Sequence, residues 1–187
     1  MTSHNGKTFG GAGVKGSFFQ DNFLASVNYH HDFGSQFSTR GITSGGSTND
    51  ANLKLAYLVP ISKSLYVGPY LSYQYQNLNN NTEYLRLHND NNAIGGGGYM
   101  AYGAGPLTIT GNVGYLAGVS ASASFQGYGM SASRSEPSSN VLQLGLQTSY
   151  QLSGPWYAFT AFKWDQYNNR GYSQDFLQGD LGLGYSF

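Results

Sequence analysis

Charged residues, cysteine and long apolar runs are all scarce in this sequence. Only 10% of its 187 residues are Asp, Glu, Lys or Arg, whereas a soluble globular domain carries about 25%. The nine Lys and Arg residues are scattered, so no basic surface for nucleic acid is expected. No stretch approaches the roughly 18 consecutive apolar residues of a membrane helix, which excludes a helical membrane protein. Cysteine is absent, which fits a protein that passes through an oxidising compartment.

Glycine, aromatic and neutral polar residues take the place of charge. The chain holds 27 Gly, 16 Tyr and 11 Phe, and its formal net charge is zero. Its mean hydropathy is −0.36, because Asn, Gln, Ser, Thr and Tyr supply the polarity. Such a composition suits a protein with a lipid-facing outside, where charge is expensive, and a wet interior. Only helices and closed barrels satisfy every backbone polar group within lipid, so a β-barrel remains.

The stretch 175–187 carries the strongest pattern, reading D-F-L-Q-G-D-L-G-L-G-Y-S-F. Alternate residues of a strand point to opposite faces, so Leu181, Leu183, Tyr185 and Phe187 share one face opposite small and polar residues. A transmembrane strand of an outer-membrane barrel is about ten residues long, apolar outward and polar inward, with aromatic residues at the interface.

The ending aromatic-x-Phe, here Tyr185 and Phe187, resembles the signal by which the outer-membrane barrel assembly machinery recognises its substrates. The resemblance implies a bacterial outer-membrane β-barrel protein, either small and porin-like or the C-terminal barrel region of a larger outer-membrane protein. It also implies that the assembly machinery, outer-membrane lipid and lipopolysaccharide are partners.

The same alternation predicts eight further strands. The expected strands are 7–19, 23–33, 50–60, 65–76, 92–103, 107–119, 141–152, 156–167 and 175–187. Short turns near residues 20, 62, 105 and 154 alternate with polar segments expected to be long loops, at 34–49, 77–91, 120–140 and 168–174. Outer-membrane barrels have short periplasmic turns and longer extracellular loops. We therefore expect an all-β, antiparallel up-and-down transmembrane β-barrel of about eight to ten strands, integral to the bacterial outer membrane.

The odd strand count leaves the domain boundary open. Single-chain bacterial barrels have even strand numbers, yet nine strands are read here. Three explanations compete: a strand before residue 1 is lacking, the Gly-rich start does not span, or a partner chain completes the sheet. Residues 1–187 are therefore expected to form a single barrel domain, with or without a further N-terminal strand.

Inward positions predict the lining of the lumen. The expected lumen-lining residues are Asn28, His30, Asn52, Lys54, Tyr70, Gln74, Asn112, Gln143, Gln147, Lys163, Asp165, Gln178 and Asp180. In a narrow barrel such residues can simply hydrogen-bond to one another and fill the interior. Amide, hydroxyl and tyrosine groups also suit a pore for passive passage of small polar solutes. Lys54, Lys163, Asp165 and Asp180 would then set the response to ions.

Three other functions are weighed against the pore. One is a structural or adhesive barrel whose long loops contact partners, and another is the membrane-anchoring barrel of a larger export or secretion protein. A third is a rim enzyme acting on lipid A or peptides at His30, His31 and Asp32, but histidine beside aspartate in sequence is weak support, because such sites depend on geometry. We predict no enzymatic activity, no metal site, since two histidines lack a third ligand, and no cofactor. The oligomeric state is left open.

Overall fold

The computed structural model describes residues 2–4, 7–39, 42–81, 85–169 and 172–186. Each regular element in these residues is a β-strand. Within this part of the chain, no helix is long and apolar enough to cross a membrane. The strands are β1 (Thr2–His4), β2 (Lys7–Gln20), β3 (Phe23–Thr39), β4 (Ile42–Tyr57), β5 (Val59–Pro60), β6 (Leu65–Asn81), β7 (Leu85–Ala104), β8 (Leu107–Gly127), β9 (Met130–Glu136), β10 (Asn140–Ser153), β11 (Trp156–Asn169) and β12 (Tyr172–Tyr185).

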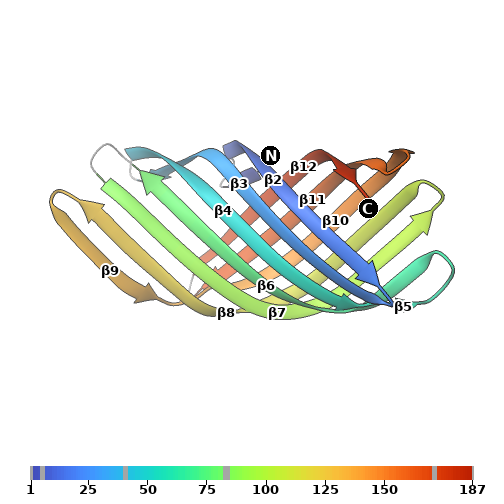
Figure 1. The fold of residues 1–187 in the computed structure, drawn as a ribbon. Helices are drawn as coiled ribbons and strands as arrows, with labels where there is room; N and C mark the ends of the chain where they lie inside the picture. Colours follow the sequence, from blue (N-terminus) through green and yellow to red (C-terminus); the bar gives the residue numbers. More distant parts are fainter. Residues whose placement is uncertain (1, 5–6, 40–41, 82–84, 170–171, 187) are drawn as a thin grey trace.

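The strands form one antiparallel sheet that curls into a barrel (Figure 1). Neighbours in the sheet follow the chain from β1 to β4 and from β6 to β8, with β5 pairing beside β6. β10 pairs with β8, and β12 pairs with β1, so the strand order returns to its start. β9 pairs with β8 as a hairpin beside this ring. The predicted antiparallel up-and-down barrel is confirmed, and β2, β3, β4, β6, β7, β8, β10, β11 and β12 are its long strands.

The end of the barrel that carries the turns after β2, β5, β7 and β10 is called the short-turn end, and the opposite end is the outer end. The turn after β2 is two residues long, and Asp21 and Asn22 both have positive φ, of 47° and 79°. Two-residue turns of this kind match the twist of antiparallel strands. Aromatic side chains pack around this end, where ring centroids lie 5.0 Å apart in Phe23–Tyr57.

A belt of apolar side chains faces outward around the short-turn half of the barrel. These side chains are far from buried, and Leu55 and Leu146 are each 51% exposed. A soluble monomer rarely exposes so continuous an apolar surface, whereas a bilayer requires one. The belt consists of Val14, Val27, Leu53, Leu55, Leu71, Ile94, Met100, Val113, Leu144, Leu146, Phe162, Leu181 and Leu183.

Most of the polar segments predicted as loops are strand instead, which corrects the sequence reading. β7 and β8 have 20 and 21 residues, about twice the 9–11 that cross a bilayer. β3 and β4 extend into the segment 34–49, β6 and β7 into 77–91, and β8 and β9 form a hairpin within 120–140. The prediction of loops failed because a strand is recognised in the sequence by an apolar face that alternates with a polar one, and these segments have no apolar face. Hydrogen bonds between strands require only the backbone.

Candidate functional site

Alternation along β3 divides three consecutive polar residues between the two faces of the barrel wall. His30 and Asp32 point inward, and each is 5% exposed. His31 points outward, where its Nδ1 lies 2.7 Å from Asn49 Oδ1. Only His30 and Asp32 can therefore take part in an internal site.

His30 and Asp32 form a hydrogen-bonded pair beneath strand β2. His30 Nε2 lies 2.9 Å from Asp32 Oδ1. A Cβ added at Gly11 would lie 2.6 Å from both of these atoms, and a Cβ at Gly13 would lie 2.9 Å from His30 Nδ1. The two glycines thus leave space for the imidazole, while the carboxylate at Nε2 fixes the orientation of the ring.

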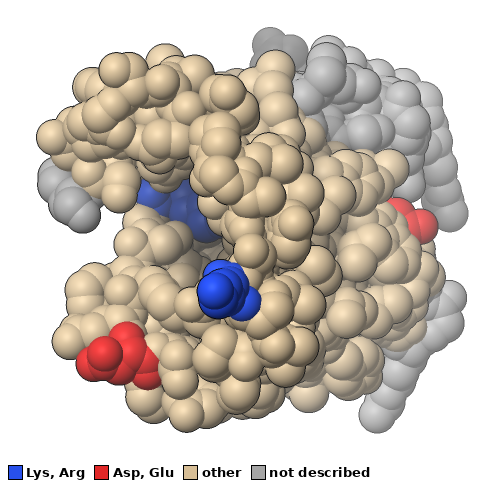
Figure 2. All heavy atoms as spheres, turned by 90° about the vertical axis from the view of Figure 1, so that its right-hand side faces the viewer, with Lys and Arg blue, Asp and Glu red and all other residues tan. Residues whose placement is uncertain are grey.

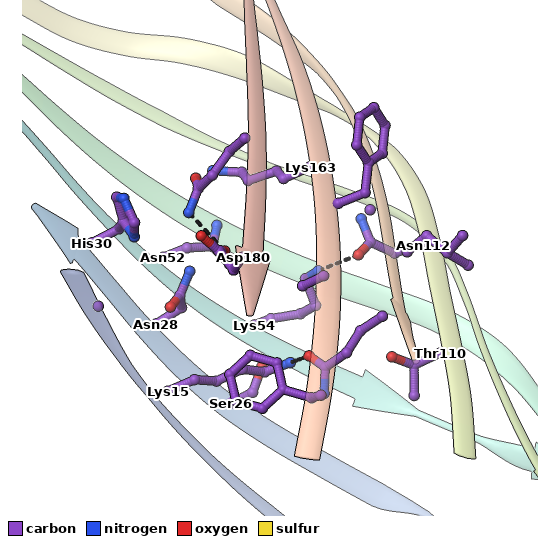
Figure 3. Close-up of a pocket in the computed structure, with 18 of the residues that line it drawn as sticks. Lys15, Ser26, Asn28, His30, Asn52, Lys54, Thr110, Asn112, Lys163 and Asp180 are labelled. Atoms are coloured by element: carbon purple, nitrogen blue, oxygen red, sulfur yellow. Dashed lines mark hydrogen bonds between the residues drawn. The ribbon is translucent and has the colours of Figure 1, made fainter. Parts of the chain in front are cut away.

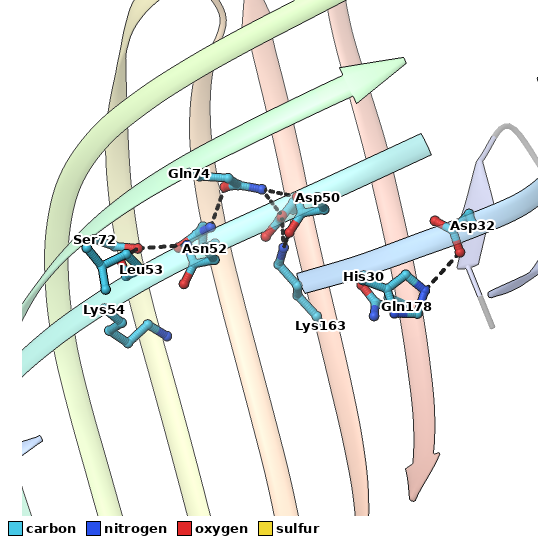
Figure 4. A network of polar contacts seen from close by, with 12 residues as sticks. His30, Asp32, Asp50, Asn52, Leu53, Lys54, Ser72, Gln74, Lys163 and Gln178 are labelled. Carbon is cyan, nitrogen blue, oxygen red and sulfur yellow. Dashed lines mark hydrogen bonds and ion pairs between the residues drawn. The ribbon is translucent and has the colours of Figure 1, made fainter. Parts of the chain in front are cut away.

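A second polar group faces this pair from other strands (Figure 4). Lys163 Nζ on β11 lies 3.0 Å from Asp50 Oδ1 on β4 and 2.8 Å from Asp165 Oδ2. Gln74 Nε2 on β6 bridges the same two carboxylates, at 2.6 Å from Asp50 Oδ2 and 3.0 Å from Asp165 Oδ2. One ammonium and one amide therefore hold two carboxylates together inside the barrel.

The group extends to β10 and further along β11 through Gln74. Gln143 Nε2 donates to Gln74 Oε1 at 2.6 Å, and Gln74 Nε2 lies 2.7 Å from the Tyr167 hydroxyl. Gln74 and Gln143 are 1% and 3% exposed. Since these contacts join strands that are not neighbours in the sheet, they cross the lumen and fill it at this height. We call this set the lumen plug: Asp50, Gln74, Gln143, Lys163, Asp165 and Tyr167.

A small pocket on the outer-end side of the lumen plug joins it to the histidine pair. Its lining includes Asp32, Asp50, Lys163, Asp165 and Gln178. Among the described residues, two of these carboxylates, Asp50 and Asp165, share one lysine. Buried Asp165 Oδ1 accepts no hydrogen bond from the described residues, and a buried oxygen of this kind is a position for water or a ligand. No group of three or more metal-ligating side chains stands close enough for a metal ion among the described residues.

A larger cavity of about 420 Å³ lies on the short-turn side of the lumen plug (Figure 3). Two lysines reach into it from neighbouring parts of the wall. Lys54 Nζ donates to Asn112 Oδ1 at 2.8 Å, and Lys15 Nζ donates to Gln147 Oε1 at 2.5 Å. Lys54 Nζ also lies 4.7 Å from the centre of the Tyr70 ring, within range of a cation–π contact. The cavity is therefore polar and carries positive charge.

The structure places most of the predicted lumen residues around this larger cavity. Those that line it are Asn28, His30, Asn52, Lys54, Asn112, Gln143, Gln147, Lys163, Asp165, Gln178 and Asp180. Gln74 belongs to the lumen plug, and Tyr70 is 3% exposed in a small apolar cluster with Ala56 and Leu58.

Sequence reasoning missed Asp32, Asp50, Lys15 and Tyr167 as interior residues. Each stands an even number of residues from an inward neighbour on the same strand, as Asp50 does from Asn52. Strict alternation would have found them. What no alternation could supply is that Asp32 and Asp50 line one pocket.

Tyr185, at the end of β12, and Phe187 form the expected assembly signal. Tyr185 faces outward at the short-turn end and packs edge-on against Trp156, with ring centroids 5.3 Å apart. Phe187 lies outside the described residues. Their role in assembly stays a prediction.

No protein-family model and no curated protein sequence matches the chain. Among solved structures, the chain is similar to the outer membrane protease OmpT from Escherichia coli, with a TM-score of 0.66 and 12% identity over 89% of this chain and 79% of that one. It is also similar to Ail, the attachment invasion locus protein of Yersinia pestis, with a TM-score of 0.45 and 16% identity over 89% of this chain and 99% of that one. Together with the apolar belt, the likeness to OmpT shows that the chain has the fold of an integral bacterial outer-membrane β-barrel.

The prediction of no enzymatic activity is contradicted by the likeness in fold to a protease at a TM-score of 0.66. The prediction rested on the lack of a catalytic motif in the sequence, which does not exclude an enzyme on this fold. The failure has a physical reason. Catalytic groups are recognised by their geometry, and here the candidate groups come from β3, β4 and β11, which only the closed barrel brings together.

Proposed function

We propose that this outer-membrane barrel hydrolyses peptide bonds at the pocket that joins the His30–Asp32 pair to Asp50 and Asp165. The observation that carries the proposal is the joint lining of one pocket by Asp32, Asp50 and Asp165, with His30 held 2.9 Å from Asp32. A histidine oriented by a carboxylate serves as a general base, and a protonated carboxyl serves as a general acid. Similarity in fold to an outer membrane protease supports this reading.

The reaction uses water as the nucleophile. His30 accepts a proton from water as the oxygen attacks the carbonyl carbon of the peptide. A proton from the Asp50–Asp165 pair passes to the leaving nitrogen as the C–N bond breaks, which gives a carboxylic acid and an amine. The proton on His30 then returns to the carboxylate pair, so the site ends as it began.

The charge of the pocket indicates the class of peptide. Among the described residues, the carboxylates of Asp50 and Asp165 share one ammonium, that of Lys163. An excess of negative groups favours a cationic side chain, because charge-assisted hydrogen bonds to carboxylates are strong. We expect cleavage of peptides beside Lys or Arg in preference to neutral or acidic peptides.

Fluorogenic peptides that contain or lack Lys and Arg, added to the refolded protein in detergent, test this function. His30→Gln and Asp165→Asn should each lower kcat/KM by about 10²- to 10⁴-fold, the usual contribution of a general acid or base. His31→Gln is the matched control, because His31 is the next residue on β3 and faces outward. Equal activity of His30→Gln and the control would contradict the proposal.

The larger cavity supports a second candidate function, the passive passage of small polar solutes. Its lining combines amides and lysines with Asp165 and Asp180 and suits small polar solutes, and the lumen plug would act as the gate. Planar-bilayer recordings test it: discrete conductance steps that change with Lys54→Gln would favour the pore. A folded protein that stays silent at all voltages would contradict the pore and leave the hydrolase unaffected.

A further inference from the structure

The barrel wall is held together differently at one place, between β2 and β12. The two strands are joined through β1, whose Thr2–His4 pair with Lys7–Phe9 on one side and with Phe176–Gln178 on the other. Beyond β1, the described part of β2 from Gly11 to Gln20 has ladder partners on β3 alone. Residues 181–184 of β12 likewise have ladder partners on β11 alone in the registers that the structure describes. We call this gap in the ladder the β2–β12 seam.

The seam is not a place where β2 and β12 can simply pair as the other strands do. Both are antiparallel to β1, so they run parallel to each other. All the strand pairings that the structure describes, including those of β1, are antiparallel. A regular antiparallel barrel needs an even number of strands, and one more strand between β2 and β12 would restore it.

The side chains along the seam show the opening. Leu181 is 85% exposed, the highest value among the exposed large hydrophobic residues described, and Leu183 and Val14 are 70% and 69% exposed. The same residues, with Lys15 and Asp180, line the larger cavity. Viewed from the short-turn end, the molecule has a deep notch with Lys or Arg atoms inside it (Figure 2). The cavity therefore reaches the side of the barrel instead of being closed by a wall.

We propose that the β2–β12 seam is the docking slot for one β-strand that continues β1 on its N-terminal side. β1 already occupies the outer end of the slot in the required direction, and its registers fix the rest. Thr2 stands opposite Phe9 and Gln178, so a continuation would run between Gly11–Gln20 and residues 181–184. About ten residues, apolar outward and small or polar inward, would complete a ten-stranded wall and cover Leu181 and Leu183.

The chain itself supplies a probe strand. β8 runs in the direction that the slot requires, and its segment Leu107–Leu116 alternates Leu, Ile, Gly, Val and Tyr outward with Thr, Thr, Asn, Gly and Leu inward. A copy of these ten residues placed directly before Met1 keeps this alternation in phase with Thr2, whose partner Gln178 faces inward. The matched control carries one glycine between the copy and Met1, because a one-residue slip turns every side chain to the other face.

Disulfide cross-linking reads the position of the probe strand, since the chain has no cysteine of its own. If the pairing registers of β1 continue into the probe strand, the copied Val113 stands opposite Val14 on β2 and Leu183 on β12. Cysteine at that copied position and Leu183→Cys should cross-link nearly completely in the in-phase fusion and at least tenfold less in the glycine control. The in-phase fusion should also melt at a higher temperature than the 187-residue protein.

Three results would overturn the proposal. One is efficient cross-linking of Val14→Cys to Leu183→Cys within a single 187-residue chain, which would mean that the seam closes on itself. Another is equal cross-linking of the in-phase and glycine fusions. A disulfide-linked species of twice the mass from Leu183→Cys alone would assign the slot to a second copy of the chain, and would likewise overturn it.

Discussion

Gly11 supports the candidate site through the side chain that it lacks. It faces the His30–Asp32 pair at a distance where a Cβ would collide with both partners. Its neighbour Gly10 has open space around it, with nothing within 4 Å of an added Cβ. The same substitution to alanine at these two adjacent glycines therefore distinguishes a general effect on strand β2 from a specific clash with the His30–Asp32 pair.

Gly11→Ala should disrupt the His30–Asp32 pair, whereas Gly10→Ala should not. Forcing a methyl group into a filled interior destabilises the folded protein by about 1–3 kcal/mol. Because the imidazole of His30 is displaced, kcat/KM for peptide hydrolysis should fall more than tenfold. Urea unfolding and peptide turnover measure the two effects. If Gly10→Ala lost as much as Gly11→Ala, the close contact would not be the cause.

A polar cluster on the outer face marks where the membrane belt ends. Asp90 accepts hydrogen bonds from Asn77 Nδ2 at 2.8 Å and from the Tyr75 hydroxyl at 2.6 Å, and it lies 3.0 Å from His88 Nε2. Burial raises the pKa of the Asp90 carboxyl, but the hydrogen bonds from Tyr75 and Asn77 and the charge of His88 outweigh it, so the pKa lies below its usual value.

Asp90 should therefore make the outer end of the barrel sensitive to acid. A carboxyl whose pKa is lower in the folded state stabilises the fold above its unfolded value of about 3.9, and this stabilisation is lost as pH falls through the folded pKa. Asp90→Asn should lower the free energy of unfolding at pH 7 and match the wild type at pH 2. Tyr75→Phe should give part of the effect. An equal loss at both pH values would contradict this account.

At the scale of elements, the β8–β9 hairpin extends the wall beyond the closed ring, and its β8 half pairs with residues 85–92 of β7. β9 pairs with β8 in the described registers, and six of its seven residues are exposed. The ring closes lower down, where Val141 to Tyr150 of β10 pair with Leu107 to Leu116 of β8.

Replacing residues 122–135 by a short glycine linker should leave the barrel folded. Ala121 and Glu136 stand opposite each other in the hairpin, so the linker can join them without strain. The heat-modifiable gel shift should persist, but the melting temperature should fall, because residues 85–90 of β7 lose their ladder partners on β8. An unfolded deletion would show that the hairpin is part of the ring. Loss of cell-surface binding by a folded deletion would favour an adhesive barrel over a hydrolase.

For the whole molecule, the lumen plug makes opposite walls of the barrel depend on each other. Lys163 forms ion pairs with two carboxylates that come from β4 and β11, and the side chain of Asp165 is only 4% exposed. Removing one partner of a buried ion pair leaves an uncompensated charge, which costs about 3–5 kcal/mol.

Lys163→Met should therefore destabilise the barrel by about 3–5 kcal/mol in urea unfolding. Lys63→Met, in the exposed turn before β6, is the matched control and should change the stability by less than about 0.5 kcal/mol. Adding Asp165→Asn to Lys163→Met should recover part of the loss, because one of the two stranded charges is removed. A Lys163→Met variant as stable as the control would mean that the lumen plug does not hold the walls together.

The strands of the lipid-spanning half, and the direction of their side chains, could be predicted from local sequence. Residues such as Leu53 and Asn52 alternate between lipid and lumen, and a period of two is a local property that any single strand displays. The short turns were predictable for the same reason, since Asp21 and Asn22 are residues that favour the left-handed region.

The outer halves of the strands, the lumen plug and the β2–β12 seam could not be predicted from the sequence, because they depend on how the strands pair and close into a barrel. Asn77 and Ser122 carry no apolar signal, so their strands appear only when neighbouring backbones pair. The meeting of Gln74 with Asp165 depends on how the strands are staggered when the sheet closes, a property of the whole barrel. The residues that face the lumen can therefore be predicted from the alternation along each strand. Which of them contact one another depends on the closure of the barrel.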